Sequence, residues 1–350
     1  MFDRRSKIGS GARHQMSLLR FFSAFMVAAF LSPVAARGLS AQTNNGQFGG
    51  LPNFQHVFVI MMENRSYTSL IGNYVDAPFI NRAATTYGLA TKYFGVTHPS
   101  QPNYIAATSG STNGVSNDND ITVDVINIVD QLEAKGKTWK AYMQSLSLCT
   151  TGPLQHACGN QLYERKHNPF ISYTDVQTDP ARVAKIVDFS QFSIDLANNS
   201  VPNYSWISPD QCNDMHGRGG PSSDPCNFDN VQGSTGLIAT GDDFLYRTVN
   251  QIMNSKVWQD GNSTIFIVWD ESDFVPPPGK EDTSGCCDSV PGGGHLVTLV
   301  ISNSVNSPVT SDLAFNHYSL LATIEGGLGL DCLAFTCDTA HVKPMRDLVN

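Results

Sequence analysis

Three continuous apolar segments, each rich in β-branched or aromatic residues, constrain the fold of this chain most strongly. They run over His56–Met62 (HVFVIMM), Ile265–Trp269 (IFIVW) and Leu296–Ile301 (LVTLVI). A half-exposed strand alternates polar and apolar residues, whereas a strand covered on both faces is apolar throughout. Sheets covered on both faces are typical of α/β proteins, in which helices connect parallel strands. The three segments therefore predict central strands of a mostly parallel sheet.

The stretches between these segments predict alternating helices and further strands. Weaker strands are expected at Leu89–Val96, Trp139–Met143 and Asn203–Ile207, and helices at Pro102–Ser109, Val123–Ala134, Pro180–Phe189, Asp242–Met253 and Tyr318–Ile324. This alternation indicates an α/β fold, with a single three-layer α/β/α domain over residues 43–350. No Pro/Gly-rich linker divides that range. The Gly/Pro/Asp-rich stretches 209–235 and 273–294 are expected to be long loops inside the domain.

The first 42 residues carry the pattern of an export signal. A basic stretch precedes a short apolar run, Leu18–Phe30, and small residues follow it. A membrane-spanning helix needs about 20 apolar residues, and this run is shorter. We therefore expect residues 1–42 to form a secretory signal peptide and a disordered N-terminus, and the product to be secreted without stable membrane insertion. A buried N-terminal helix is the alternative.

The eight cysteines agree with export, because all of them lie after this segment and their number is even. Short spacings predict two local bridges, Cys149–Cys158 and Cys332–Cys337. The other four cysteines have two options: Cys212 with Cys226, or both with the adjacent Cys286 and Cys287. A zinc ribbon would need two CxxC-like pairs, which the sequence lacks.

The charge of the chain excludes one class of partner. The formal net charge is −9, and the 22 Lys and Arg residues are scattered along the sequence. Proteins that bind nucleic acid gather basic residues into a patch that contacts the phosphates. We therefore expect no nucleic-acid partner.

Acidic and amide side chains follow the central strands at the point where each strand ends. Glu63 and Asn64 follow the first segment, and Asp270 and Glu271 follow the second. Ligands of open parallel sheets bind beyond the carboxyl ends of the strands. Carboxylates beside buried apolar strands are costly unless they are paired or bind a metal. These residues therefore predict a shared cation, the alternatives being a helix cap at the first pair and a solvated loop start at the second.

Ser100 stands close to the start of a predicted helix, after the strand at Leu89–Val96. The amide N–H groups at a helix N-terminus attract anions. A Ser hydroxyl is a poor nucleophile at its ordinary pKa, and metal coordination activates it. Together with the acidic residues, Ser100 implies in-line attack on a phosphoryl or sulfuryl centre whose anionic oxygens are held by cations. The alternative is a simple N-cap.

Four motifs, in the same order along the chain, resemble those of a known family. Met62–Tyr67 is similar to its ENR-S-F opening, Ser100–Tyr104 to its nucleophile segment, Trp269–Asp273 to its D-E motif, and Phe315–Leu321 to its penultimate helix. The chain is identified as a member of the bacterial and fungal phosphoesterase family. That family holds acid phosphatases and non-specific phospholipases C within the alkaline-phosphatase-like superfamily. The resemblance covers about residues 55–326 and implies an alkaline-phosphatase-like fold.

The resemblance also implies roles for individual residues. Ser100 is implied to be the phosphorylated nucleophile, and the residues implied to bind a divalent metal are Glu63, Asn64, Ser100, Asp270, Glu271 and Asp210. His216 and His295 are expected to be catalytic. With Asp210 they form either a second metal site or a cluster that binds phosphate and protonates the leaving group. Oxygen ligands favour Mg, Ca or Mn, and a site with His suits Zn.

Further residues near these motifs are expected to bind substrate: His98, Asn103 and His317. Surface or structural roles are the alternatives for the His residues and for Asp210. Two departures from the family's pattern favour a phosphatase over a phospholipase: Phe274-Val275 stands where the phospholipases have D-H-V, and the chain is shorter than theirs. Tyr104 occupies the Arg position of the sulfatase signature, which argues against a sulfatase.

We therefore expect a secreted, metal-dependent phosphoesterase that hydrolyses small phosphate monoesters, in the manner of acid phosphatases, through a phosphoserine. Two alternatives stay open. One is a phospholipase C-like phosphodiesterase on the same scaffold. The other is an exported protein that only binds a cation or phosphate, although a binder has no need of a nucleophile beside a metal.

Overall fold

The computed structural model describes residues 48–228, 235–273 and 281–350, so the predicted signal segment lies outside the described residues. The strands are β1 His56–Met62, β2 Gly88–Phe94, β3 Trp139–Met143, β4 Ala157–Cys158, β5 Tyr163–Glu164, β6 Ile186–Asp188, β7 Tyr204–Ser208, β8 Ser263–Trp269, β9 His295–Ser302 and β10 Val309–Asn316. The helices are α1 Tyr67–Leu70, α2 Pro78–Thr86, α3 Ser100–Ser109, α4 Ile128–Ala134, α5 Thr174–Gln177, α6 Pro180–Val183, α7 Ser190–Ala197, α8 Thr235–Met253, α9 Lys256–Asp260 and α10 His317–Leu328. Short 3₁₀ turns connect several of them.

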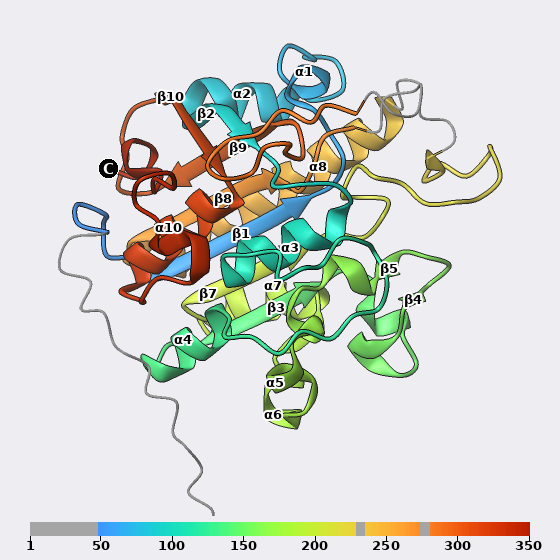
Figure 1. Cartoon of the computed structure of the whole chain (residues 1–350). Coiled ribbons are helices and arrows are strands. Elements are labelled where there is room, and N and C mark those ends of the chain that lie inside the picture. Colours follow the sequence, from blue (N-terminus) through green and yellow to red (C-terminus); the bar gives the residue numbers. More distant parts are fainter. Residues whose placement is uncertain (1–47, 229–234, 274–280) are drawn as a thin grey trace, which may run out of the picture. The chain divides into compact units, whose positions relative to one another are not determined.

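Eight of the strands form one sheet in the order β10-β2-β9-β8-β1-β7-β3-β6. Neighbouring strands are parallel except at β9, which is antiparallel to both β2 and β8. Figure 1 shows α3 and α10 in front of this sheet and α8 behind it. The predicted three-layer α/β/α fold with a mostly parallel sheet is therefore confirmed.

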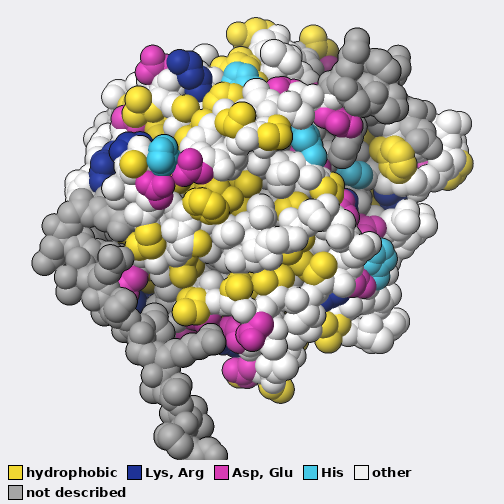
Figure 2. Space-filling model, in the orientation of Figure 1, with side chains coloured by type: hydrophobic (Ala, Val, Ile, Leu, Met, Phe, Trp, Pro, Cys, Tyr) yellow, Lys and Arg dark blue, Asp and Glu magenta, His cyan; other side chains and the backbone are white. Residues whose placement is uncertain are grey.

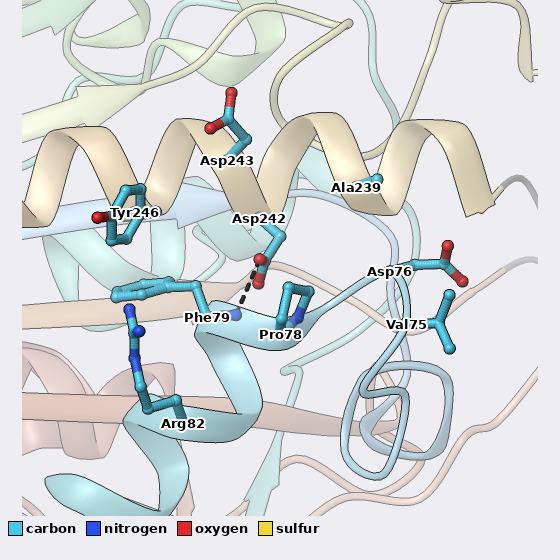
Figure 3. A pocket seen from close by; sticks show the side chains of 9 residues that line it. All are labelled: Val75, Asp76, Pro78, Phe79, Arg82, Ala239, Asp242, Asp243 and Tyr246. Carbon is cyan, nitrogen blue, oxygen red and sulfur yellow. Dashed lines mark hydrogen bonds between the residues drawn. The ribbon is translucent and has the colours of Figure 1, made fainter.

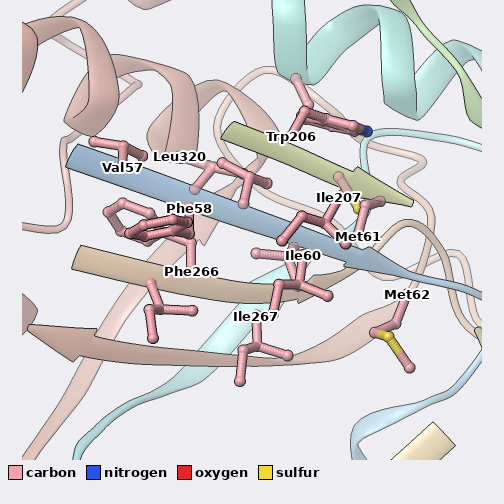
Figure 4. Close-up of a cluster of buried hydrophobic side chains, with 14 of the residues drawn as sticks. Val57, Phe58, Ile60, Met61, Met62, Trp206, Ile207, Phe266, Ile267 and Leu320 are labelled. Carbon is pink, nitrogen blue, oxygen red and sulfur yellow. The ribbon is translucent and has the colours of Figure 1, made fainter. Parts of the chain in front are cut away.

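The core is built on the central strands β1 and β8. Every residue of β8 is buried, and so is every residue of β1 after His56. Figure 4 shows Phe58 and Ile60 of β1 among side chains of β7 and β8, with Leu320 of α10 close by. Each fully buried side chain of this size contributes about 1.5–3 kcal/mol relative to an exposed one. Burial on both faces explains why these strands are apolar at every position.

Helix α2 is held against α8 by a carboxylate from the partner helix. The N-cap residue of α2, Ala77, makes no side-chain capping bond. Asp242 of α8 accepts hydrogen bonds at 2.9 Å from the backbone N–H of Phe79, which Figure 3 shows, and from that of Ile80. The first-turn N–H groups of a helix have no partner within the helix. Asp242 therefore supplies the missing cap and fixes how the two helices pack.

The secondary structure differs from the prediction in several places. The single helix expected at Pro180–Phe189 is wrong: only α6 is helical, and Ile186–Asp188 pairs with β3 as the edge strand β6. Pairing at the sheet edge overrides the helical spacing there, because β-branched residues fit a pleated surface. The helix expected at Val123–Ala134 begins only at Ile128, where Asn127 forms a capping box. Strand β10 and helix α2 had no predicted counterparts.

Four disulfides join the eight cysteines: Cys149–Cys158, Cys212–Cys226, Cys286–Cys287 and Cys332–Cys337. The two predicted local bridges are confirmed, and Cys212 takes the first of its two options. Among the described residues, no helix combines the length and the apolar character needed to cross a bilayer. On the face drawn in Figure 2, the described Lys and Arg side chains are dispersed rather than gathered in a patch.

Candidate active site

The polar residues that follow the strands gather at one edge of the sheet. Strands β1, β2, β7 and β8 all point the same way, so their carboxyl ends lie at this edge. Glu63 continues β1 and Asp270 continues β8. Strand β9 runs in the opposite direction and therefore starts at the same edge, with His295. The sheet topology thus brings together segments that are far apart in the sequence.

Ser100 lies between carboxylates from two of these strand ends. It is the first residue of α3 and is 1% exposed. Its Oγ lies 2.9 Å from Glu271 Oε1 and 3.1 Å from Glu63 Oε2, within hydrogen-bond distance of both. The Ser100 hydroxyl therefore lies close to Glu63 and Glu271, as predicted.

Asn64 links the two acidic strand ends. Its backbone N–H donates to Asp270 Oδ1 at 3.1 Å, and its Nδ2 donates to Glu271 Oε1 at 3.3 Å. Its φ of 42° lies in the left-handed region, which Asn tolerates better than most residues. Asn64 Oδ1 and Asp270 Oδ2 stay buried without a hydrogen-bond partner in the described part of the chain. Hard divalent cations take such oxygen ligands, so the donor set fits a metal.

The protonation of these carboxyl groups is strongly perturbed. Burial, and then the charge of Glu271, raises the pKa of Asp270 to about 8. Burial, and then the charge of Asp270, also raises the pKa of Glu63 well above its usual range, although Lys166 opposes this. Three carboxylates in a dry site repel one another unless positive charge is added. A divalent cation would supply that charge.

Asn103 holds the segment that leads into Ser100. Its Oδ1 accepts hydrogen bonds from the backbone N–H groups of Val96 at 2.8 Å and Thr97 at 3.1 Å. Its Nδ2 donates to the carbonyls of Thr97 at 2.8 Å and Pro99 at 3.1 Å. Asn103 is fully buried. The backbone thus occupies the Asn103 amide, and Asn103 is a positioning residue for Ser100. The substrate-binding role expected for Asn103 stays a prediction.

We expect Asn103→Ala to destabilise the fold by about 2–4 kcal/mol, because it leaves the buried N–H of Val96, the half-buried N–H of Thr97 and two half-buried carbonyls without this partner. Urea unfolding of the variant measures this change. Asn254→Ala is the matched control, since Asn254 is exposed and donates to one carbonyl at 2.8 Å. Its expected change is within about 0.5 kcal/mol. Equal stability of the two variants would contradict the positioning role.

His98 contacts the acidic cluster directly. Its Nδ1 contacts Glu271 Oε2, and its Nε2 lies 3.1 Å from the carbonyl oxygen of Asp282. Burial lowers the pKa of His98, but the hydrogen bond to Glu271 and the charge of that carboxylate outweigh it and raise the pKa to about 9. The ring therefore carries a positive charge at neutral pH beside Ser100, which suits an anionic substrate.

His317 and His295 lie at the same edge but contact the scaffold. His317 Nε2 is 2.7 Å from the carbonyl oxygen of Asp270 and Nδ1 is 3.0 Å from the Tyr93 hydroxyl. Burial lowers the pKa of His317 to about 4. His295 Nε2 lies 2.8 Å from the carbonyl oxygen of Thr91. Both nitrogens of His317 are thus engaged by the protein, and the structure gives it a role in positioning Asp270.

The loop after β7 presents a second buried carboxylate, Asp214, besides the predicted Asp210. Asp210 is engaged within the loop and its surroundings: it accepts from Ser145 Oγ at 2.7 Å and from the backbone N–H of Cys212 at 3.2 Å. Asp214 is 1% exposed, and its backbone carbonyl accepts from the N–H of Glu63 at 2.9 Å. Burial raises the pKa of Asp214 well above its usual range. Asp214 is therefore the better candidate from this loop.

His216 lies in the same loop and is neutral. Its Nδ1 is 2.6 Å from the carbonyl oxygen of Gly217, so Nδ1 is the protonated nitrogen in the neutral ring. Burial, and then the charge of Lys166, lowers the pKa of His216 to about 4. Its backbone N–H donates to Asp214 Oδ1 at 2.7 Å. This arrangement leaves Nε2 as the ring atom that accepts a proton or a ligand.

Three residues to which the sequence assigned no role in the site lie near the cluster. His167 Nε2 lies 3.1 Å from Glu63 Oε1, and the Tyr104 hydroxyl donates to the same oxygen. Lys166 Nζ lies 2.9 Å from Asp118 Oδ2. Burial lowers the pKa of Lys166, but the charges of Glu63 and Asp118 outweigh it and raise the pKa. Lys166 thus keeps a positive charge near the acidic groups.

The comparisons with known proteins agree with this geometry. The Phosphoesterase family profile matches residues 73–331. A phosphatidylinositol-3-phosphatase of Mycobacterium tuberculosis is 28% identical, with 95% of this chain and 93% of that protein covered. A phosphate-repressible acid phosphatase of Penicillium chrysogenum is 26% identical over 74% of this chain. The chain spans 56% of that fungal protein.

Solved structures share the fold. A protein of the alkaline phosphatase superfamily from Vibrio parahaemolyticus aligns with a TM-score of 0.53 and 13% identity, over 81% of this chain and 69% of that one. The C-terminal periplasmic domain of the phosphoethanolamine transferase EptC from Campylobacter jejuni aligns with a TM-score of 0.50 and 11% identity, over 86% and 96%. The sheet and the sequence therefore lead to one assignment: the chain belongs to the phosphoesterase family and is a phosphoric ester hydrolase.

Proposed function

We propose that this protein hydrolyses phosphate monoesters through a phosphorylated Ser100, with a divalent metal at the adjacent acidic residues. The observation that carries the proposal is the buried Ser100 hydroxyl, held within 3.1 Å of Glu63 Oε2 and 2.9 Å of Glu271 Oε1. A hydroxyl needs activation to act as a nucleophile, and an acceptor or cation at this distance provides it. The names of the relatives support the choice of ester, because both are phosphatases.

The reaction consists of two phosphoryl transfers, first to Ser100 and then to water. Ser100 Oγ gives up its proton and bonds to phosphorus as the bond to the leaving oxygen breaks, and the leaving oxygen takes a proton. Water then bonds to phosphorus, and Ser100 Oγ leaves and regains a proton. The positive charge on His98 lies beside Glu271 and Ser100 and favours the phosphoryl oxygens. His216 Nε2 is the candidate that moves the proton of the leaving group or of water.

The metal would be held by oxygen atoms at the ends of β1 and β8. Glu63, Asn64, Asp270 and Glu271 fit this role, as Asn64 Oδ1 and Asp270 Oδ2 are buried without hydrogen-bond partners in the described part of the chain. When bound, a divalent cation lowers the pKa of a coordinated hydroxyl and neutralises charge on the phosphoryl oxygens. An all-oxygen set favours Mg, Ca or Mn, and a set that includes a His would suit Zn.

We also propose that the protein is exported. The signal pattern in residues 1–42 supports this, and so do the four disulfides, because such bonds persist in oxidising compartments. Detection of the mature chain, beginning near residue 43, outside the cytoplasm would test this part of the proposal.

A matched pair of esters tests the reaction. p-Nitrophenyl phosphate is a monoester, and bis(p-nitrophenyl) phosphate is the diester with the same leaving group. We expect the metal-supplemented protein to have a kcat/KM at least about 100-fold higher for the monoester, a difference of roughly 2.7 kcal/mol in transition-state stabilisation. A preference for the diester would favour the phospholipase C-like alternative. Metal binding without turnover of either ester would leave only a binding protein.

A further inference from the structure

A polar pocket opens beside the candidate active site, between the β4–β5 hairpin and the loop after β7. Its cavity volume is about 280 Å³, and its lining includes Lys166 and His216. Asp118, also in the lining, accepts a hydrogen bond at 3.0 Å from the backbone N–H of Gln101, the residue that follows Ser100. The pocket therefore adjoins the start of α3, where the nucleophile stands.

The Lys and Arg side chains of this pocket are each paired with a carboxylate. Lys166 Nζ lies 2.9 Å from Asp118 Oδ2, and Arg218 Nη2 lies 2.9 Å from Asp224 Oδ2. Neither cation is therefore available as an isolated charge for a second phosphate group. The pocket instead offers a nearly neutral, hydrogen-bonding lining.

The remaining polar groups suit hydroxyl groups. Glu164 lines the pocket, is half-buried, and its carboxylate makes no side-chain hydrogen bond to another described residue. Gln211 also lines it, is 4% exposed, and has an Oε1 without a hydrogen-bond partner among the described residues. A carboxylate accepts hydrogen bonds, and an amide side chain both donates and accepts them. Together these two groups match an alcohol that carries several hydroxyls.

One aromatic side chain completes the lining. Phe228 is 40% exposed and is the only large apolar residue among the described residues that line the pocket. A single ring in a polar pocket offers a flat face to a sugar-like ring but no groove for an alkyl chain. The Cys212–Cys226 and Cys149–Cys158 bridges lie in the two segments that form the walls. Cross-linked walls are pre-organised, which lowers the cost of ordering them around a ligand.

We propose that this pocket holds the alcohol part of the substrate and selects a polyhydroxylated alcohol, such as a sugar or a cyclic polyol, over an aliphatic one. The inference rests on the proposed function, since the phosphate of the same molecule would lie at Ser100. A site that hydrogen-bonds substrate hydroxyls discriminates against analogues that lack them, because its polar groups are then left unpaired.

Glucose 6-phosphate and n-hexyl phosphate test this selection, because both are primary alkyl monoesters and only the first carries hydroxyls. We expect Glu164→Ala to lower kcat/KM for glucose 6-phosphate 10- to 100-fold and to change the value for n-hexyl phosphate less than twofold. Glu164→Gln keeps a hydrogen-bonding group, and we expect it to retain at least a third of the wild-type value. Asp243→Ala removes an exposed carboxylate of α8, away from the pocket, and is the matched control with no expected change.

The possible outcomes separate the two proposals. An equal loss on both esters in Glu164→Ala, or no loss on glucose 6-phosphate, overturns the pocket assignment while hydrolysis itself stands. Absence of hydrolysis of both esters by the metal-supplemented wild-type protein overturns the proposed function, and the pocket assignment with it. A loss confined to glucose 6-phosphate supports both.

Discussion

Ser100→Ala is expected to lower kcat for p-nitrophenyl phosphate by at least about 10⁴-fold, the order of effect seen when a catalytic nucleophile is removed. Ser100 Oγ is the hydroxyl that lies between Glu63 and Glu271 in the buried cluster, at 3.1 and 2.9 Å. Ala at this position keeps the first residue of α3 and removes only the oxygen. The loss should therefore appear in kcat, with little change in the substrate's binding.

Ser109→Ala is the matched control for this experiment. Ser109 is a buried serine at the other end of α3, and its Oγ donates to the carbonyl of Ile105 at 2.8 Å. We expect this variant to keep wild-type kcat, and circular dichroism to show the same helix content in both variants. Wild-type turnover by Ser100→Ala would remove the nucleophile from the mechanism. Trapping of labelled phosphate on the wild-type protein after acid quench, and none on Ser100→Ala, would support it directly.

The parts of the site that were predictable from the sequence are those attached to buried strands. Glu63 and Asp270 follow β1 and β8 without a break, so their place is fixed by strands whose apolar character is visible in the sequence. Tyr104 was predictable in principle, because it lies four residues after Ser100 and shares its helix face. Its hydroxyl donates to Glu63.

The other residues of the site come from long loops. In a loop, the spacing of residues along the sequence does not show which side chains point toward the site. Asp210 and Asp214 both follow β7 and both are buried, and only the folded loop, closed by the Cys212–Cys226 bridge, brings Asp214 against Glu63. His167 ends a 3₁₀ turn that no periodic pattern of apolar residues predicts. Tertiary contacts determine which loop residues reach the site, so a sequence pattern identifies these residues poorly.

Removal of divalent metal is expected to abolish hydrolysis and to destabilise the folded protein. Dialysis against a chelator should lower kcat by at least about 10³-fold, because the charge that balances Glu63, Asp270 and the phosphoryl oxygens is lost. Elemental analysis before and after dialysis measures the metal, and re-addition of Mg, Ca, Mn or Zn identifies the one that restores activity. At a metal concentration 100 times the Kd, binding stabilises the fold by about 2.7 kcal/mol.

The pH dependence of stability distinguishes the proposed cation site from a cluster of polar groups that binds no ion. Burial raises the pKa of Asp270 from 3.8 to about 8 in the folded, metal-free protein. Between these pH values the folded protein keeps a proton that the unfolded chain has released, so the melting temperature of the metal-free protein should fall as pH rises. A bound cation replaces that proton, and the gap between the metal-bound and metal-free melting temperatures should therefore widen over the same range. Asp270→Asn should weaken both trends, and the remainder belongs to Glu63 and Asp214, whose pKa values burial also raises. Asp243→Asn, at an exposed carboxylate of α8, should keep both trends in full. A metal-free protein whose stability rises from pH 4 to pH 8 would contradict the assignment of Asp270 as a buried, cation-binding carboxylate.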